Sequence, residues 1–376
     1  MTIYLDNMAA TPIDPRVAER HCTAMRDIGA NPHSVEHKAG VEAQAAMDRA
    51  ACSILEMLEA RVDEVTFTPG ASSALWLAVE DAISRVSGRI TRVAATVVEH
   101  PALLAALRRA ERDGRISLDF VPVDDTAAPR LEVIEQVLAS GVDLLCTMAA
   151  NNEVGTVTNM EAIGSLAARH GVRHLVDASQ AAGRIDMTDV MIADLIVLSG
   201  AKVYGPRRTG ALIGRITHQA AGLAHDVFGS PDAPSAIALA HALELRLVEG
   251  IEDERRIACM RDRMQARLVE LVPRLAVNGD PNARLPGSLH VSTPHVSGEA
   301  AISRLWGRVA ISTGAACQSG VPGPSHVLSA MNVPEWVRDG AVRIGVGQFN
   351  TDAEIDEAAE IIAEALVPAV PTRNYA

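Results

Sequence analysis

The chain is poor in lysine, in aromatic residues and in long apolar runs. Of its 34 basic residues only Lys38 and Lys202 are lysines, and aromatic residues make up 3% of its 376 positions. The net charge is −13 and the sequence pI is near 5.4, so the chain lacks the basic surface that binding to a nucleic-acid backbone requires. No segment approaches the roughly 18 apolar residues of a membrane span. We therefore expect no direct nucleic-acid partner and no membrane association.

Cysteine is also scarce, and its distribution excludes a disulfide framework. The five cysteines are odd in number and widely scattered. The start of the sequence, "MTIYLDNMAA", lacks the charged and apolar regions of a signal peptide, so we expect a reducing, cytoplasmic location. Cys22, Cys52, Cys146 and Cys259 stand in helical or strand-like apolar contexts and are expected to be packed thiols. Cys317 lies among small residues and turn formers, "STGAACQSGVPGP", which predicts a surface loop.

The hydrophobic pattern predicts an α/β fold with a mostly parallel sheet flanked by helices. Near-continuous apolar runs, typical of strands buried on both faces, alternate with stretches of helical period. From about residue 240 the pattern changes to a long charged helix followed by short strands and a final helix near 352–366. We expect a large domain over 15–255 and a smaller α+β domain over 256–376, completed by 1–14. The apolar runs are "EVTFTPG" (64–70), "RVAATVV" (92–98), "DLLCTMAA" (143–150), "RHLVDAS" (173–179) and "DLIVLSG" (194–200).

Polar and small residues follow the apolar runs, at the strand ends where open α/β sheets bind ligands. Taken singly, each has an ordinary structural explanation: Asp177 as a helix N-cap, 70–72 as a turn, His100 as the end of a strand. Together they favour a site. A lysine on a rigid turn forms a Schiff base with an aldehyde cofactor, and a carboxylate keeps a pyridinium nitrogen protonated. A turn that opens a helix binds phosphate. Lys202, Asp177 and the turn at 70–72 therefore match the requirements of pyridoxal 5′-phosphate.

The same segments resemble a known family nearly end to end. The family is the NifS-like cysteine desulfurases, in the class V aminotransferase group of fold-type I pyridoxal-phosphate enzymes. The segments that carry the resemblance are "YLDNMAATPIDPRV", "NPHS", "FTPGASSA", "VEH", "NNEVG", "VDASQAAG", "LSGAKVYGP", "STGAACQSG" and "VRIGVGQFNTDAEID".

The resemblance implies a role for each matching residue that meets the cofactor ring. Lys202 would bind the cofactor covalently, and Asp177 would pair with the pyridine nitrogen. Gln180 would hydrogen-bond the phenolic oxygen, and His100 would stack on the ring and transfer protons. Asn152 would contact cofactor or substrate.

The resemblance also implies the phosphate, substrate and sulfur positions. Arg343, with Asn31 and Asn152, would bind the substrate carboxylate, and Cys317 would be the nucleophile that takes the sulfur of L-cysteine. The family is homodimeric, and a protein acceptor would receive the sulfur. The phosphate would be held by Ala71, Ser72 and Ser199, and by Ser230 acting across the dimer.

The chain departs from the family at several positions around the phosphate. Ala201 replaces the usual histidine before the lysine, and Val227 replaces an arginine in "VFGSP" (227–231). After the phosphate turn, the positions where the family usually has Glu and Asn are filled by Ser73 and by apolar residues that include Trp76. Arg208 stands where the family commonly has glycine. These changes suggest a specialised member of the family.

Three functions follow from these residues. The first is a cysteine desulfurase that makes L-alanine and a persulfide on Cys317. The second is a cysteine or selenocysteine β-lyase, which would not need the thiol in "STGAAC". The third is a paralogue with weakened cofactor binding that serves as a partner in a sulfur-transfer complex, as Ala201 and Val227 suggest. The sequence does not identify the sulfur acceptor.

Overall fold

A seven-stranded sheet forms the centre of the computed structural model, which describes residues 2–314 and 325–368. Its strand order is β2-β8-β7-β6-β5-β3-β4, and only β8 runs against its neighbours. The strands of the described residues, in chain order, are β1 (Ile3–Tyr4), β2 (Val65–Thr68), β3 (Thr91–Thr96), β4 (Ile116–Val121), β5 (Leu144–Met148), β6 (Arg173–Asp177), β7 (Leu195–Ser199), β8 (Gly210–Ile213), β9 (Ala276–Asn278), β10 (Ser288–Ser292), β11 (Val309–Ala310) and β12 (Ala341–Gly345).

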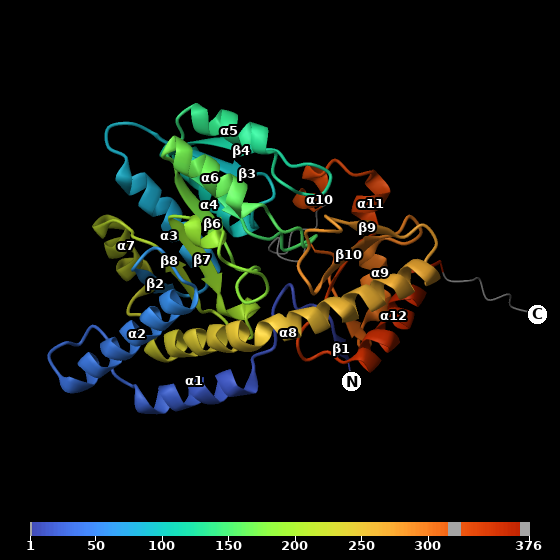
Figure 1. The fold of residues 1–376 in the computed structure, drawn as a ribbon, viewed down its shortest axis with the longest axis horizontal. Coiled ribbons are helices and arrows are strands. Elements are labelled where there is room, and N and C mark those ends of the chain that lie inside the picture. The colour runs from blue at the N-terminus through green and yellow to red at the C-terminus, as the bar shows by residue number, and fades with distance from the viewer. Residues whose placement is uncertain (1, 315–324, 369–376) are drawn as a thin grey trace, which may run out of the picture.

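Helices cover both faces of this sheet (Figure 1). The helices are α1 (Pro15–Asp27), α2 (Lys38–Met57), α3 (Ala71–Arg85), α4 (Pro101–Arg112), α5 (Leu131–Ala139), α6 (Met160–His170), α7 (His218–Phe228), α8 (Ala233–Leu271), α9 (Gly298–Leu305), α10 (His326–Ala330), α11 (Glu335–Asp339) and α12 (Asp352–Leu366), with short 3-10 turns η1 (Val190–Ile192) and η2 (Gly200–Lys202).

Alternate residues of each strand enter different cores. Val93 and Ala95 of β3 pack with α3, α4 and α7 on one face, whereas Ala94 packs with α2, α5, α6 and the first part of α8 on the other. This is the two-residue period of a strand. Because both faces are covered, the central strands need apolar residues at every position, which explains the continuous apolar runs.

A second core lies beyond the large sheet. The antiparallel strands β9, β10 and β12 pack with the last part of α8 and with α9 and α12, and the core also takes in Ile3 and Leu5 of the N-terminal segment. The N-terminal segment is attached to this part of the molecule by β1, which pairs in parallel with β11. The first residues of the chain thus pack against its last third.

Helix α8 is 39 residues long and belongs to both cores. Leu239 and Leu243 contribute to the first core, and Met260 and Met264 to the second. Figure 1 shows the helix extending from the helices under the large sheet to the smaller sheet. The domain boundary predicted near residue 255 falls within this helix and stays a prediction.

The mostly parallel sheet confirms the predicted fold class, and all five apolar runs form strands. The cysteine prediction is partly wrong. Cys146 is buried in β5, but Cys22, Cys52 and Cys259 are exposed on the outer sides of α1, α2 and α8. Within residues 2–314 and 325–368, no helix has the length and apolar character to cross a membrane, and no group of three or more His, Cys, Asp or Glu side chains is arranged to hold a metal ion.

Candidate active site

A cavity of about 240 Å³ opens at the carboxyl ends of β5, β6 and β7. Met148, Asp177 and Ser199 end these three strands and line it. The location agrees with the general rule for open α/β sheets. The predicted site residues that line the cavity are Lys202, Asp177, Gln180, His100, Asn152, Ala71, Ser72 and Ser199.

Lys202 ends the 3-10 turn that follows β7. The turn is tight because Gly200 lies against the segment that folds back after Lys202. A Cβ on Gly200 would lie 2.5 Å from the carbonyl oxygen of Pro206. The Lys202 Nζ donates to the carbonyl oxygen of Met8 at 2.9 Å and also to that of Ala9. The N-terminal segment therefore holds the amine at the cavity.

Asp177 is buried at the end of β6, where its carboxylate is fixed by the next turn. The backbone N–H of Ser179 donates to Asp177 Oδ1 at 2.9 Å. Ser179 and Asn152 also line the cavity, and both residues are more than nine-tenths buried. The atoms of interest are the Ser179 hydroxyl and the Asn152 side-chain oxygen. Neither of these two oxygens has a hydrogen-bond partner among the described residues. Buried polar atoms of this kind ordinarily have partners, so they indicate that the cavity accommodates a polar ligand.

His100 caps the N-terminus of α4 with its side chain. The backbone N–H of Ala102 donates to His100 Nδ1 at 3.1 Å, so the neutral imidazole carries its proton on Nε2. Burial lowers the pKa of His100; Asp177 opposes this shift, whereas Lys202 and His326 add to it. The neutral ring is the form that this environment favours.

Gln180 is held from two sides. Its Nε2 donates to the Met8 carbonyl oxygen at 2.9 Å, and its Oε1 accepts from Arg184 at 2.7 Å. Arg184 is buried and also donates to the Lys202 carbonyl oxygen at 3.0 Å. Arg184 thus positions both Gln180 and the lysine turn. Sequence reasoning missed it, although it follows Gln180 by four residues directly after the "VDASQAAG" segment.

The turn before α3 is shaped for an anion. Gly70 is the N-cap residue of α3; it has a φ of +106° and no side chain with which to cap the helix N-terminus. Strand β8 passes directly beneath: a Cβ on Gly210 would lie 2.6 Å from the carbonyl carbon of Gly70 and 2.7 Å from the backbone N of Ala71. Only glycine allows this approach. The helix start at Ala71 and Ser72 therefore faces the cavity, as phosphate sites require.

Arg343 is buried in β12 and does not line the cavity. Its Nη1 donates to the Asn152 backbone oxygen at 2.9 Å, and its Nη2 forms an ion pair with Asp6 at 2.9 Å. It lies directly behind a residue of the cavity wall. Its carboxylate partner Asp6 was not predicted.

Two predicted residues lie away from the cavity, and one lies outside the described residues. Asn31 and Ser230 are exposed, and the Asn31 Nδ2 donates to the Ser230 hydroxyl at 2.9 Å. Neither lines the cavity of its own chain. Cys317 lies outside the described residues. The described ends of its segment meet at Glu153: Ser325 donates to the Glu153 carboxylate, and a Cβ on Gly314 would lie 3.3 Å from it.

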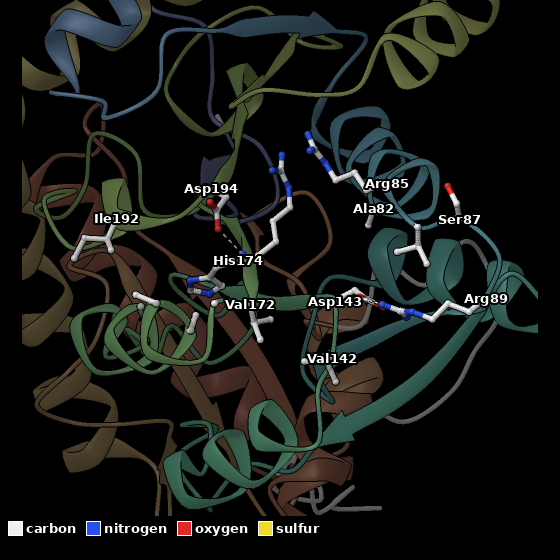
Figure 2. A pocket seen from close by; sticks show the side chains of 16 residues that line it. Ala82, Arg85, Ser87, Arg89, Val142, Asp143, Val172, His174, Ile192 and Asp194 are labelled. Carbon is white, nitrogen blue, oxygen red and sulfur yellow. Dashed lines mark hydrogen bonds and ion pairs between the residues drawn. The ribbon is translucent and has the colours of Figure 1, made fainter.

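A second, larger cavity of about 660 Å³ lies at the amino ends of the strands, on the opposite edge of the sheet (Figure 2). Two of its arginines already pair with carboxylates. Arg89 pairs with Asp143 at 2.6 Å, and Arg85 pairs with buried Asp81 at 2.9 Å. Its described lining includes no lysine. The cavity at the carboxyl ends of the strands does contain Lys202 and is the candidate active site.

The chain resembles known proteins over nearly its whole length. The model of the family "Aminotransferase class-V" matches residues 3–358. The cysteine desulfurase IscS of Shewanella baltica is 33% identical over 379 residues, which cover 97% of this chain and 93% of that relative. A cysteine desulfurase of Mus musculus is 31% identical, with 95% and 80% covered.

Solved structures give the same result. A structure described as a NifS-like protein superposes with a TM-score of 0.86 and 28% identity, covering 97% of this chain and 99% of the other. The fold, the lysine turn and the relatives all agree with the resemblance drawn from the sequence. The chain therefore belongs to the class V aminotransferase family, among the cysteine desulfurases of the NifS and IscS type.

Proposed function

We propose that the protein is a pyridoxal-phosphate-dependent cysteine desulfurase that converts L-cysteine to L-alanine and leaves the sulfur as a persulfide on Cys317. The observation that carries the proposal is the meeting of three groups at one cavity: the Lys202 amine, the buried Asp177 carboxylate and the N-terminus of α3. Few other cofactors call for an amine, a carboxylate and a phosphate site together.

The residues of the cavity fit this cofactor. When bound, pyridoxal phosphate supplies an electron sink for reactions at the substrate's α-carbon. Lys202 would attach to its aldehyde, and Asp177 would hold a proton on its ring nitrogen. The phosphate would lie at Ala71, Ser72 and Ser199. Asn152 and Ser179 each have a buried side-chain oxygen without a hydrogen-bond partner in the described part of the chain, and these oxygens would provide further contacts to the bound cofactor.

The substrate's carboxylate would be bound by Arg343. Because this guanidinium is already paired with Asp6, a bound carboxylate would have to share it. Its Nε has no partner among the described residues and would be the donor to such a carboxylate. Asn152 stands between Arg343 and the cavity, since its backbone oxygen accepts from Arg343 while its side chain lines the site.

Proton transfer at His100 is constrained by its cap. Nδ1 accepts from the Ala102 N–H and Nε2 carries the proton, so His100 can take up a proton only at Nδ1, after the contact with Ala102 breaks. In the capped state His100 offers Nε2–H as a hydrogen-bond donor.

The sulfur transfer balances without an external oxidant. The Cβ–S bond of cysteine breaks, an S–S bond forms to the Cys317 sulfur, and the carbon gains a C–H bond, which yields alanine. The thiol must be ionised to attack. Both described ends of the segment that carries Cys317 lie at Glu153, which neighbours Asn152 of the cavity wall. This supports delivery of the thiol to the site.

We also propose that the protein acts as a homodimer. Asn31 and Ser230 are exposed, bonded to each other and outside their own cavity. Residues in this position can reach the site of a second copy. The sulfur acceptor is proposed to be a separate protein.

Replacement of Cys317 tests the function directly. Cys317→Ala should retain bound cofactor and its visible absorbance with cysteine, yet form almost no alanine or sulfide. Cys259→Ala, which removes an exposed thiol of α8, should behave as the parent protein. Mass spectrometry after cysteine treatment should find one added sulfur on Cys317 of the parent. Normal sulfide release by Cys317→Ala would instead establish a β-lyase.

A further inference from the structure

The backbone of Arg208 adopts a conformation that glycine, not arginine, favours. Its φ is +57°, in the left-handed region. A side chain in that region costs on the order of 1–2 kcal/mol, and such outliers concentrate at functional sites. Arg208 stands two residues before Gly210, the residue that lets β8 pass beneath the α3 turn.

Arg208 lies at the wall of the candidate active-site cavity, beside the turn that precedes α3. It lines the cavity together with Gly70, Ala71 and Ser72, and its Cα lies 3.9 Å from the point where a Cβ on Gly70 would be. The residue is exposed, and it forms no hydrogen bond or ion pair with any residue of 2–314 or 325–368. In a chain with a net charge of −13, where many arginines pair with carboxylates, this guanidinium is uncommitted.

Ala201, which lines the same cavity as Arg208, supplies no polar group to it. Ala201 lines the cavity with a methyl group only. Lys202 is the other strong cation of the wall, and its Nζ donates to the carbonyl oxygens of Met8 and Ala9. An anion at the N-terminus of α3 would therefore have Arg208 as its available strong cation. Guanidinium binds phosphate through two parallel hydrogen bonds, which an ammonium group cannot do.

We propose that Arg208 binds the 5′-phosphate of the cofactor and takes the place of the polar side chain that Ala201 lacks. The inference rests on the proposed function, because it presumes that pyridoxal phosphate is the ligand. It is supported independently by Asn152 and Ser179, whose buried side-chain oxygens have no hydrogen-bond partner among residues 2–314 and 325–368 and so mark the same cavity as a ligand site.

The test separates charge from backbone conformation. Apoprotein would be titrated with pyridoxal 5′-phosphate and with pyridoxal, which lacks the phosphate. Arg208→Gly should weaken the binding of pyridoxal phosphate about ten- to a hundredfold and leave pyridoxal binding unchanged. Because glycine relieves the left-handed strain, the same apoprotein should melt about 1–3 °C higher. Arg208→Ala should weaken phosphate-dependent binding equally but without the gain in melting temperature.

Arg207→Ala is the matched control. Arg207 is the adjacent exposed arginine and does not line the cavity, so its removal should leave both dissociation constants unchanged. Unchanged binding of pyridoxal phosphate by Arg208→Gly, or an equal loss for both ligands, would overturn the inference while leaving the proposed function intact. If the parent apoprotein binds neither ligand, the proposed function fails and the inference fails with it.

Discussion

Substitution of Gly210 by alanine should damage the fold and the proposed phosphate site together. The added Cβ would lie 2.6 Å from the Gly70 carbonyl carbon, 2.7 Å from the Ala71 backbone N and 2.9 Å from the Leu198 carbonyl oxygen. All three atoms belong to backbone, so none can rotate away. Overpacking of this kind typically costs about 1–3 kcal/mol. The relief available is a displacement of the α3 turn away from β8, which would misalign the helix start with the cavity.

The assay is urea unfolding of the apoprotein, combined with titration of pyridoxal 5′-phosphate. Gly210→Ala should lower the free energy of unfolding by about 1–3 kcal/mol and weaken cofactor binding. The control is Gly222→Ala in α7, where a Cβ meets nothing within 4 Å. Because alanine is the better helix former, this control should gain about 0.5–1 kcal/mol and bind cofactor normally. Equal unfolding curves for Gly210→Ala and the parent would refute the reasoning.

Three further predictions concern single side chains. Lys202→Ala should lose cysteine turnover and the visible absorbance of the attached cofactor; normal turnover by this variant would contradict the whole proposal. Ala201→His should tighten binding of pyridoxal phosphate about ten- to a hundredfold by adding a hydrogen bond to a charged group. The gain should be largest in the Arg208→Ala protein, and unchanged affinity in both the parent and the Arg208→Ala protein would contradict this prediction. Burial lowers the pKa of His174 to about 4. Below pH 6.5 the unfolded chain therefore binds a proton that the folded chain does not. The free energy of unfolding should fall as the pH is lowered from 6.5 towards 4. The stability advantage of the parent over His174→Gln, measured by urea unfolding, should therefore shrink by up to about 1.4 kcal/mol per pH unit across that window, and a constant difference would refute the assignment.

The sequence predicted the buried strands well because burial on both faces leaves a continuous apolar signal. It did not identify β4 or β8. Strand β4, at the sheet edge, carries exposed residues such as Asp119, and β8 is a four-residue strand that begins at a glycine. Strand β4 alternates apolar and polar residues, so it lacks the continuous apolar run by which the buried strands were recognised, and β8 is short and begins at a glycine.

The sequence predicted those site residues that directly follow a buried strand or lie in a segment resembling the family. The contacts that complete it join positions distant in the chain. The carbonyl oxygens of Met8 and Ala9 accept from Lys202, and Asp6 pairs with Arg343. Backbone acceptors carry no side-chain signature, and an ion pair across 337 positions has no local spacing to reveal it.

The exposed cysteines show a related limit. Cys22, Cys52 and Cys259 lie on helices whose apolar residues outnumber those that fit on the buried face. Composition identifies the helix, but the helical phase decides which side chain is covered. A small thiol is tolerated on either side, so its type alone does not fix that phase.

The pairing of β1 with β11 has a consequence for synthesis of the chain on the ribosome. Ile3 and Tyr4 find their strand partners only at Val309 and Ala310, and Asn7 bonds to Gly345. At about 5–20 residues per second, translation separates the emergence of these partners by roughly 15–60 s. The large sheet and its helices can emerge and pack during that interval. The carbonyl oxygens of Met8 and Ala9, which accept from the Lys202 amine, therefore reach their final anchorage only near the end of translation.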